Sequence, residues 1–252
     1  MKLYVFFTPE ELSLSKKFLP TPNTVVVLDI LRATTTITTA IELGARYVKV
    51  FPSVSALRDE LEHLLLRYRR EDIFCLGERD GKMIEGFDEG NSPVKLFNVN
   101  IKDKIVLMTT TNGTRAISLV SNVREVICGC LRNRMAICDY LFNKGKEVVF
   151  ILCSGWKGGF SLEDSFGAGA IIEGLSILGV DIQLANDQAM CSRQLYRDYL
   201  EDPSYLLKNC CHGKRLLAIG CKEDISFCSS LDKSFYVAVK KTSLRFEALK
   251  VT

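Results

Sequence analysis

Four apolar segments of this 252-residue sequence are each followed at once by residues that can bind an anion or a metal ion. The groups are hydroxyls, glycines, guanidinium groups and carboxylates. They stand in DILRATTT from Asp29, in ERDG from Glu78 on to EGNSP, in TTTNGTR from Thr109, and in SGWKGGFSLED from Ser154. Backbone N–H groups and guanidinium can hold an anion, and the remaining carboxylates suit a hard metal ion. The sequence therefore predicts an anion or phosphate site.

Asp29 and the threonines after it can also be interpreted as ordinary helix-start residues. Asp29 could simply cap the following helix, and the hydroxyls of Thr34, Thr35 and Thr36 could serve only its backbone. The position of Asp29 straight after an apolar strand, with Arg32 three residues on, favours a functional role, because ligands collect at strand carboxyl ends in open α/β sheets. The N–H groups of the threonines would then face the bound anion.

The later segments have structural alternatives too. Ser161-Leu-Glu163-Asp164 resembles a capping box, so one of its two carboxylates could be purely structural. Asn91-Ser92-Pro93 could be a plain turn. Cys153 ends a strand and opens a glycine-rich loop, which makes it a candidate nucleophile. A cysteine phosphatase, however, needs an arginine at the far end of that loop, and residues 154–160 contain none.

Several familiar motifs are absent from the sequence. Neither GK at 81–82 nor GK at 145–146 is followed by Ser or Thr, which excludes a Walker loop. No GxGxxG follows the strand expected at Thr24–Ile30, and there is no Gly-x-Ser-x-Gly. The two histidines, His63 and His212, stand in poor context for a hydrolase triad.

The elements that must position these residues follow a βα rhythm. Strands are expected at Thr24–Ile30, Tyr47–Phe51, Ile73–Gly77, Lys104–Thr110, Glu125–Cys130, Glu147–Cys153 and Tyr236–Val239. Helices are expected at Thr35–Leu43, Ser55–Arg70, Thr114–Val120, Arg134–Asn143, from the glycine-rich loop through Leu178, and at Gln194–Lys208. Strands separated by helices predict a three-layer α/β/α domain with a mostly parallel or mixed central sheet, formed by residues 1–252.

Composition indicates an ordinary globular chain. Hydrophobic residues make up 47%, and a net charge of +3 is too small to imply a nucleic-acid footprint. No apolar run approaches the ~20 residues of a membrane span, and acidic residues follow the start too soon for a signal peptide. We therefore expect a cytoplasmic protein. Its ten cysteines should be reduced core thiols, because Cys128-Gly-Cys130 and Cys210-Cys211 lack the CxxC spacing of a zinc site.

Four long motifs resemble those of a known family. They are VVVLDILRATTTI, GERDGKMIEGFDEGNSP, TTTNGTRAI and CSGWKGGFSLEDSFGAGAII, in this order and at these intervals. Together they are similar to the 2-phosphosulfolactate phosphatases of the ComB type, densely over residues 25–174 and thinly over 191–252. The resemblance implies a magnesium-dependent phosphatase with a three-layer α/β/α fold, which hydrolyses 2-phosphosulfolactate to 3-sulfolactate and phosphate in coenzyme M biosynthesis. One departure is Asp80, where a small residue is more usual; an acid beside Arg79 would weaken anion affinity or tune metal binding.

On this resemblance, the needs of phosphoryl transfer give the candidate residues their roles. The catalytic set is Asp29, Arg32, Glu78, Arg79 and Glu163, with Mg²⁺ held by members of the set Asp29, Glu78, Glu163 and Asp164. Substrate or phosphate binding is assigned to Thr34, Thr35, Thr36, Asn91, Ser92, Thr111, Asn112, Gly113, Thr114, Cys153 and Ser154. Lys157 could hold a second anionic group. The nucleophile stays open between Asp29 and a metal-activated water, which the lack of an Asp-x-Asp pair slightly favours.

Two other functions fit the same residues. A phosphotransferase or lyase acting on a related phospho- or sulfo-acid would use the same site with another acceptor. A non-catalytic anion-binding α/β module would need only the basic groups, and carboxylates after three different strands argue against it. We expect a small anionic substrate, and neither a nucleic acid nor a membrane as partner. The sequence leaves open whether the chain forms a homo-oligomer.

Overall fold

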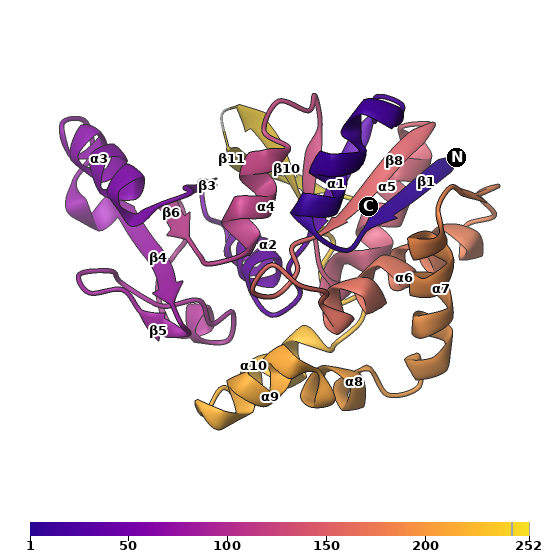
Figure 1. The fold of residues 1–252 in the computed structure, drawn as a ribbon. Helices are drawn as coiled ribbons and strands as arrows, with labels where there is room; N and C mark the ends of the chain where they lie inside the picture. Colours follow the sequence, from indigo (N-terminus) through magenta and orange to yellow (C-terminus); the bar gives the residue numbers. More distant parts are fainter. Residues whose placement is uncertain (243, 252) are drawn as a thin grey trace.

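The computed structural model describes residues 1–242 and 244–251. Eleven strands form one sheet in the order β5-β4-β6-β3-β11-β10-β7-β2-β8-β1-β9. Helices cover both faces of this sheet (Figure 1). The predicted three-layer α/β arrangement with a mixed sheet is therefore confirmed.

The strands are short, and several are apolar throughout. In β2, TVVVL, every residue is buried, as expected for a strand covered on both faces. The strand bounds are β1 Lys2–Phe6, β2 Thr24–Leu28, β3 Tyr47–Val50, β4 Ile73–Arg79, β5 Lys82–Met83, β6 Ile105–Thr109, β7 Val126–Gly129, β8 Val148–Cys153, β9 Gln183–Leu184, β10 Tyr236–Thr242 and β11 Arg245–Lys250.

The helices include one break that contradicts the sequence prediction. Their bounds are α1 Pro9–Ser15, α2 Ala33–Glu42, α3 Val54–Leu65, α4 Gly113–Leu119, α5 Arg134–Asn143, α6 Leu162–Ile177, α7 Asp187–Tyr199, α8 Pro203–Asn209, α9 Cys211–Ala218 and α10 Lys222–Cys228. The single helix predicted at Gln194–Lys208 is wrong. Asp202 caps α8 by accepting a hydrogen bond from Tyr205 N–H, and Pro203 occupies its first turn, so α7 and α8 are separate.

The sheet has two parallel halves joined by an antiparallel hairpin. Strands β4, β6 and β3 run parallel to one another, and so do β7, β2, β8, β1 and β9. Between the halves, the hairpin β10–β11 pairs antiparallel with β7 on one side and with β3 on the other. Three successive antiparallel pairings give the two halves opposite directions in the sheet.

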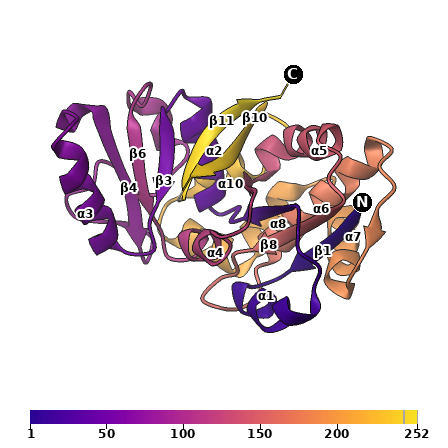
Figure 2. The same ribbon diagram turned by 90° about the horizontal axis from the view of Figure 1, so that it is seen from above.

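The twist of the sheet nevertheless brings the carboxyl ends of β2 and β6 together. Five strand-to-strand steps separate these strands in the sheet order, and roughly 20–25° of twist per step turns the strand direction by about 100° or more. Figure 2 shows the two halves running in clearly different directions. A Cβ added to Gly113, which follows β6, would lie 2.6 Å from the Cβ of Ala33, which follows β2. The carboxyl ends therefore meet where the halves cross.

The hydrophobic core has three parts. One lies around α5 and α6 and includes Ile137 and Phe166. The second surrounds α2 and α4 and reaches β11 at Phe246. The third places Leu57 of α3 against β4 and β6. No helix among residues 1–242 and 244–251 is long and apolar enough to cross a membrane.

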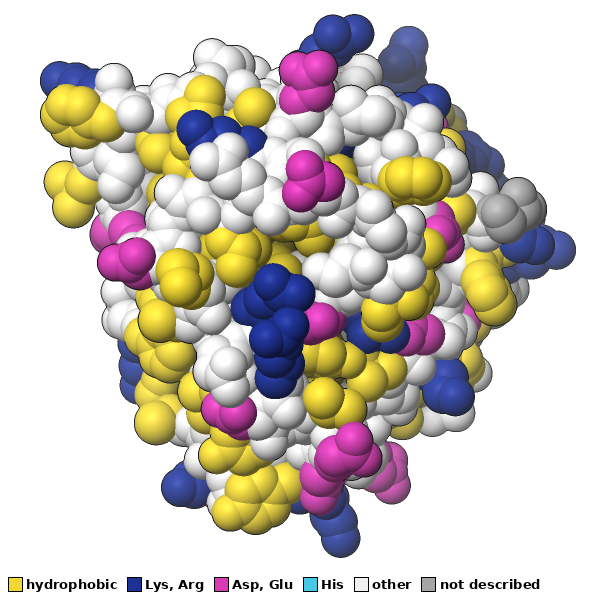
Figure 3. Space-filling view, turned by 90° about the vertical axis from the view of Figure 1, so that its right-hand side faces the viewer, with side chains coloured by type: hydrophobic (Ala, Val, Ile, Leu, Met, Phe, Trp, Pro, Cys, Tyr) yellow, Lys and Arg dark blue, Asp and Glu magenta, His cyan; other side chains and the backbone are white. Residues whose placement is uncertain are grey.

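The face that carries α6 and α7 has a mixed surface. Basic, acidic and hydrophobic side chains are interspersed across it (Figure 3). Arg193 and Arg197 of α7 both contact Oε1 of Glu173 on α6, at 2.6 and 2.7 Å. Charges on these two helices are thus partly paired with each other.

Candidate functional site

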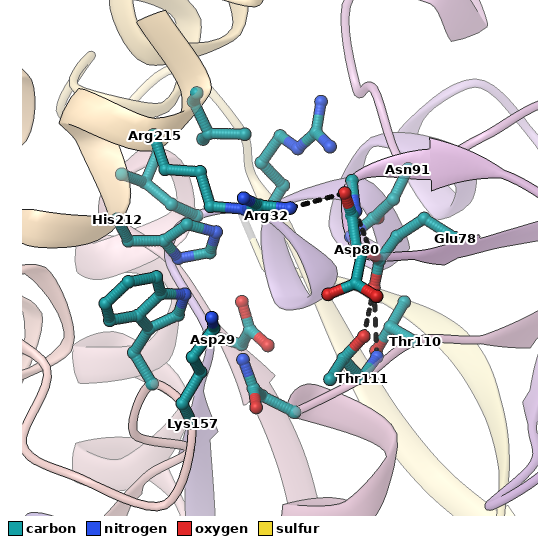
Figure 4. Close-up of a pocket in the computed structure, with 15 residues that line it drawn as sticks. Asp29, Arg32, Glu78, Asp80, Asn91, Thr110, Thr111, Lys157, His212 and Arg215 are labelled. Carbon is teal, nitrogen blue, oxygen red and sulfur yellow. Dashed lines mark hydrogen bonds between the residues drawn. The ribbon is translucent and has the colours of Figure 1, made fainter. Parts of the chain in front are cut away.

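A pocket lies where the ends of β2, β4 and β6 meet helix α9 (Figure 4). It is lined by Asp29, Leu31, Arg32, Glu78, Asp80, Gly81, Asn91, Thr110, Thr111, Asn112, Trp156, Lys157, His212, Arg215 and Leu216. Several of these lining residues were predicted from the sequence as site residues: Asp29, Arg32, Glu78, Asn91, Thr111 and Asn112. The fold thus brings residues from all four predicted segments to one place.

Asp29 is held at the pocket wall by the start of α2. Its Oδ1 accepts a hydrogen bond from Ala33 N–H at 3.1 Å, and its own N–H donates to Oγ1 of Thr34 at 2.9 Å. Its Oδ2 lies over Gly113, where an added Cβ would come within 2.7 Å. Burial raises the pKa of Asp29 to about 6, against the opposing effects of His212 and the Ala33 hydrogen bond. Asp29 therefore accepts a hydrogen bond from the first residue of α2, whose N-cap is Arg32, and also presents a carboxylate to the pocket.

Glu78 ties together two loops of the site. Its Oε1 accepts hydrogen bonds from the N–H and the hydroxyl of Thr111, both at 3.0 Å, and its Oε2 accepts one from Gly81 N–H at 2.8 Å. Asp80 and Gly81 have φ of 54° and 76°, which a type I′ turn between β4 and β5 requires. The Asp-Gly pair is a hairpin signal that the sequence analysis did not use. The carbonyl of Asp80 accepts a hydrogen bond from Arg215 at 2.5 Å.

Arg32 forms a buried ion pair on the pocket wall. Its Nη1 lies 2.5 Å from Oδ2 of Asp224 on α10, and the two side chains are 5% and 4% exposed. Oδ1 of Asp224 accepts a hydrogen bond from the Ser92 hydroxyl at 2.6 Å. Burial alone would lower the pKa of Arg32, but the charge and hydrogen bond of Asp224 outweigh it and raise that pKa. The guanidinium is therefore charged and fixed in place beside the pocket.

The C-terminal helices supply a wall that the sequence analysis missed. Helices α8, α9 and α10 lie together below the sheet in the view of Figure 1. His212 of α9 stacks on Trp156, with ring centroids 5.8 Å apart and an angle of 21°. Its Nδ1 lies 3.3 Å from Oε1 of Glu163, at the start of α6. Burial favours neutral Glu163, but the hydrogen bond and charge of His212 outweigh it and lower the pKa of Glu163.

Apart from Thr111, the predicted threonines lie outside the pocket lining, and their hydroxyls form hydrogen bonds with the local backbone. The hydroxyl of Thr35 donates to the Ile30 carbonyl at 2.8 Å, and that of Thr36 donates to the Arg32 carbonyl at 3.0 Å. Thr34 accepts from Asp29 N–H, as described above. The hydroxyl of Thr114 donates to the Thr110 carbonyl at 2.9 Å. The hydroxyls of Thr34, Thr35 and Thr36 therefore bond to the backbone at the start of α2, as the helix-start interpretation predicts.

Arg79, Asp164, Cys153, Ser154 and Ser92 also lie outside the lining of this pocket. Arg79 donates to Oγ1 of Thr109 at 3.0 Å, and Oδ1 of Asp164 accepts from Ile30 N–H at 2.8 Å. Burial, followed by the charges of neighbouring carboxylates, raises the pKa of Asp164 well above its usual range.

Cys153 is a core residue in this fold. Its side chain is fully buried, and burial raises the pKa of its thiol well above the usual range. A neutral, enclosed thiol cannot act as a nucleophile or present a charge to an anion. All ten cysteines are free, as the sequence predicted, but Cys191 and Cys211 are exposed, so the prediction that all ten are core thiols is wrong for these two.

Oxygen ligands suitable for Mg²⁺ are present on the pocket wall. Asp29 and Glu78 are the carboxylates of the predicted metal set that line the pocket. Oδ1 of Asn91, on the same wall, is buried and without a hydrogen-bond partner in the described part of the chain. Mg²⁺ takes one or two protein carboxylates, with waters and phosphate oxygens completing six ligands. Glu163 and Asp164 are engaged elsewhere, and no group of three His, Cys, Asp or Glu among the described residues could hold a metal.

The pocket therefore combines two kinds of group. The carboxylates of Asp29, Glu78 and Asp80 share the pocket lining with the cationic side chains of Arg32, Lys157 and Arg215 (Figure 4). The cations can bind a multiply charged anion, and a carboxylate whose pKa is about 6 is suited to nucleophilic, basic or metal-binding roles near neutral pH.

A family model and several named relatives all match this chain under the same family name. The family model for 2-phosphosulpholactate phosphatase matches residues 6–243. A protein of Cyanothece sp. named "Probable 2-phosphosulfolactate phosphatase" is 38% identical over 236 residues, covering 92% of this chain and 93% of the relative. Proteins with the same name from Microcystis aeruginosa and Synechocystis sp. are 36% and 38% identical, covering 96% and 92% of this chain and 97% and 93% of their own lengths.

Proposed function

Because the chain belongs to the 2-phosphosulfolactate phosphatase family, we propose that it is a magnesium-dependent phosphatase that hydrolyses 2-phosphosulfolactate to 3-sulfolactate and phosphate. Its relatives are phosphoric monoester hydrolases by name, and this chain has the same class of activity. The observation that carries the proposal beyond family membership is the pocket itself, in which Asp29 shares a wall with three cationic side chains.

The pocket has as many cationic side chains as the substrate has acidic groups. 2-Phosphosulfolactate has three acidic groups: a phosphate ester, a carboxylate and a sulfonate. Arg32, Lys157 and Arg215 can each neutralise one of them, and guanidinium groups do so with directed pairs of hydrogen bonds. Arg32 is the most buried of the three, so we assign it to the phosphate, where fixed charge is most useful.

Asp29 acts on the phosphorus side of the reaction. Its carboxylate is ionised above a pKa of about 6 and lines the pocket, so it can attack phosphorus or remove a proton from the attacking water. Asp29, Glu78 and Asn91 would hold a magnesium ion. When bound, that ion would neutralise charge on the phosphate oxygens. The hydrogen bonds of Glu78 keep the loops before β5 and α4 in position around the phosphate.

Phosphate release from racemic 2-phosphosulfolactate tests the proposal, measured with and without Mg²⁺ beside phospholactate and an aryl phosphate. We expect magnesium-dependent release that prefers the sulfonate. Asp29→Asn should lower kcat by about 10³-fold or more, because it removes the ionisable group. Asp198→Asn, an exposed change on α7, is the matched control and should keep full activity.

Other outcomes would redirect the assignment. Equal release from all three esters would retain the phosphatase and discard the substrate. Phosphate transfer to an added alcohol in preference to water would indicate a phosphotransferase. Tight binding of sulfolactate without release from any ester would indicate a binding module.

A further inference from the structure

The roles proposed above leave His212 and Glu163 without a task in catalysis. Glu163 is almost completely buried, with its side chain 3% exposed, while His212 is 18% exposed and lines the pocket. A buried carboxylate in contact with an imidazole at a pocket wall resembles neither a solvated surface pair nor a helix cap. The helix cap of α6 is provided by Ser161, whose hydroxyl accepts from Asp164 N–H at 3.3 Å.

The surroundings of His212 fix the orientation of its ring. Glu163 approaches Nδ1, and the ring lies nearly flat against Trp156. Turning the ring would break both contacts, so Nε2 is the nitrogen left to serve the pocket. A carboxylate that accepts a hydrogen bond from Nδ1–H fixes the orientation of the ring and leaves Nε2 as the nitrogen that can donate a proton in the pocket.

The proposed reaction needs such a proton donor. The leaving oxygen of a 2-phosphorylated hydroxy acid belongs to a secondary alcohol, and its alkoxide is too basic to leave without a proton. Arg32, Arg215 and Lys157 are already assigned to the three acidic groups of the substrate. Asp29 is already assigned to the phosphorus side. Among the groups that line the pocket, the imidazole of His212 is the one matched to this task.

We propose that His212 is the general acid that protonates the leaving oxygen, and that Glu163 is the positioning residue that holds its ring. The inference rests on the proposed phosphatase function. As the oxygen of water bonds to phosphorus, the bond from phosphorus to the ester oxygen breaks and its electron pair stays on that oxygen. The Nε2 proton of His212 moves to the same oxygen and gives the product hydroxyl. The neutral imidazole is reprotonated with the proton released from the attacking water, so charge and atoms balance.

His212→Gln provides the test, assayed on an alkyl ester and on an aryl ester. p-Nitrophenolate leaves readily without a proton, whereas the alkoxide of 2-phosphosulfolactate or phospholactate does not. We expect kcat on the alkyl esters to fall 10²- to 10³-fold, with KM changed by less than about threefold. On p-nitrophenyl phosphate the loss should stay below about threefold. His63→Gln, at an exposed position on α3, is the control and should change neither rate.

Glu163 should act only through His212. Glu163→Gln keeps an oxygen that can accept the Nδ1 hydrogen bond but removes the charge, so we expect an intermediate loss of about 10-fold on alkyl esters alone. The protein has a single tryptophan, Trp156, so its fluorescence reports whether the His212 stack is intact in each variant. Far-UV circular dichroism establishes that the variants are folded.

Each result supports or overturns the inference. Equal loss on alkyl and aryl esters would show that His212 acts on the attacking water or on the fold, and would overturn the general-acid role. Full activity of His212→Gln on alkyl esters would overturn it too. A wild-type protein that releases phosphate from no ester would overturn the proposed function and this inference together, whereas an active wild type with equal losses would overturn this inference alone.

Discussion

At the scale of single residues, Asp29 is buried although its proposed role requires the charged form. Its pKa is raised by burial from its ordinary value of 3.8 to about 6. Between these two values the folded state holds a proton that the unfolded state has lost. Folding stability from this group is therefore highest at low pH and falls as pH rises through about 6. The ionised form that the proposed mechanism requires is therefore the form that destabilises the fold.

A pH profile and one substitution test this relation. Phosphatase activity should fall about tenfold per pH unit below pH 6, as Asp29 becomes protonated.

In Asp29→Asn, without added metal, the free energy of unfolding at pH 8 should rise by up to about 3 kcal/mol, because one unit of pKa shift corresponds to 1.36 kcal/mol. Urea unfolding at pH 5 and pH 8 measures the free energy of unfolding of the variant and of the wild type, with Asp198→Asn as control. An Asn variant less stable than wild type at pH 8 would contradict the prediction.

The sequence predicted one side of the pocket and not the other. Asp29 and Glu78 were predictable because polar residues directly after apolar strands have a general structural meaning. His212, Arg215 and Asp224 were not, because they lie in short helices without a motif and reach the pocket only through tertiary packing.

At the scale of elements, the close approach of α9 to the end of α8 positions His212. A Cβ added to Gly213 would come 1.7 Å from the carbonyl oxygen of Leu207 and 3.2 Å from Sγ of Cys210. The two helices can therefore approach this closely only with glycine at that position. His212 and Arg215 are in the same helix, so the close approach also positions the C-terminal wall of the pocket.

Gly213→Ala should disturb the fold and the site together. The methyl group must push α9 away from α8, which we expect to cost about 1–3 kcal/mol or more. Activity on alkyl esters should fall at least tenfold, and Trp156 fluorescence should change as the stack on His212 loosens. Gly90→Ala is the matched control, because the nearest atom to its Cβ would be 3.7 Å away. Equal stability and activity of the two variants would show that the helices can adjust freely.

Predictions of elements were accurate where the pattern was local. The helix predicted at Arg134–Asn143 has these same bounds in the structure. The strand predicted at Thr24–Ile30 begins at Thr24 as predicted and ends two residues earlier, at Leu28. The hairpin β10–β11 was predicted only in part, at Tyr236–Val239. Its place between β7 and β3 could not be predicted, because pairing between strands this far apart leaves no periodic signal in either strand.

At the scale of the whole molecule, the last strands hold the two halves of the sheet together. β10 pairs with β7 through Ala238 and Val239, and β11 pairs with β3 through Arg245 and Phe246. Without this hairpin, β7 and β3 would be open edges in the middle of the protein. The pocket draws on both halves, with Asp29 after β2 and Thr111 after β6, so its geometry depends on the hairpin too.

Phe246→Ala tests whether the halves form one cooperative unit. Phe246 is fully buried and belongs to the core cluster around α2 and α4, whereas Phe235, just before the hairpin, is 66% exposed. Phe246→Ala should cost about 3–5 kcal/mol, and Phe235→Ala should cost little. Urea unfolding followed by Trp156 fluorescence and by circular dichroism should give one coincident transition in the wild type. Two separate transitions, or equal effects of the two substitutions, would mean that the halves unfold independently and that the hairpin does not couple them.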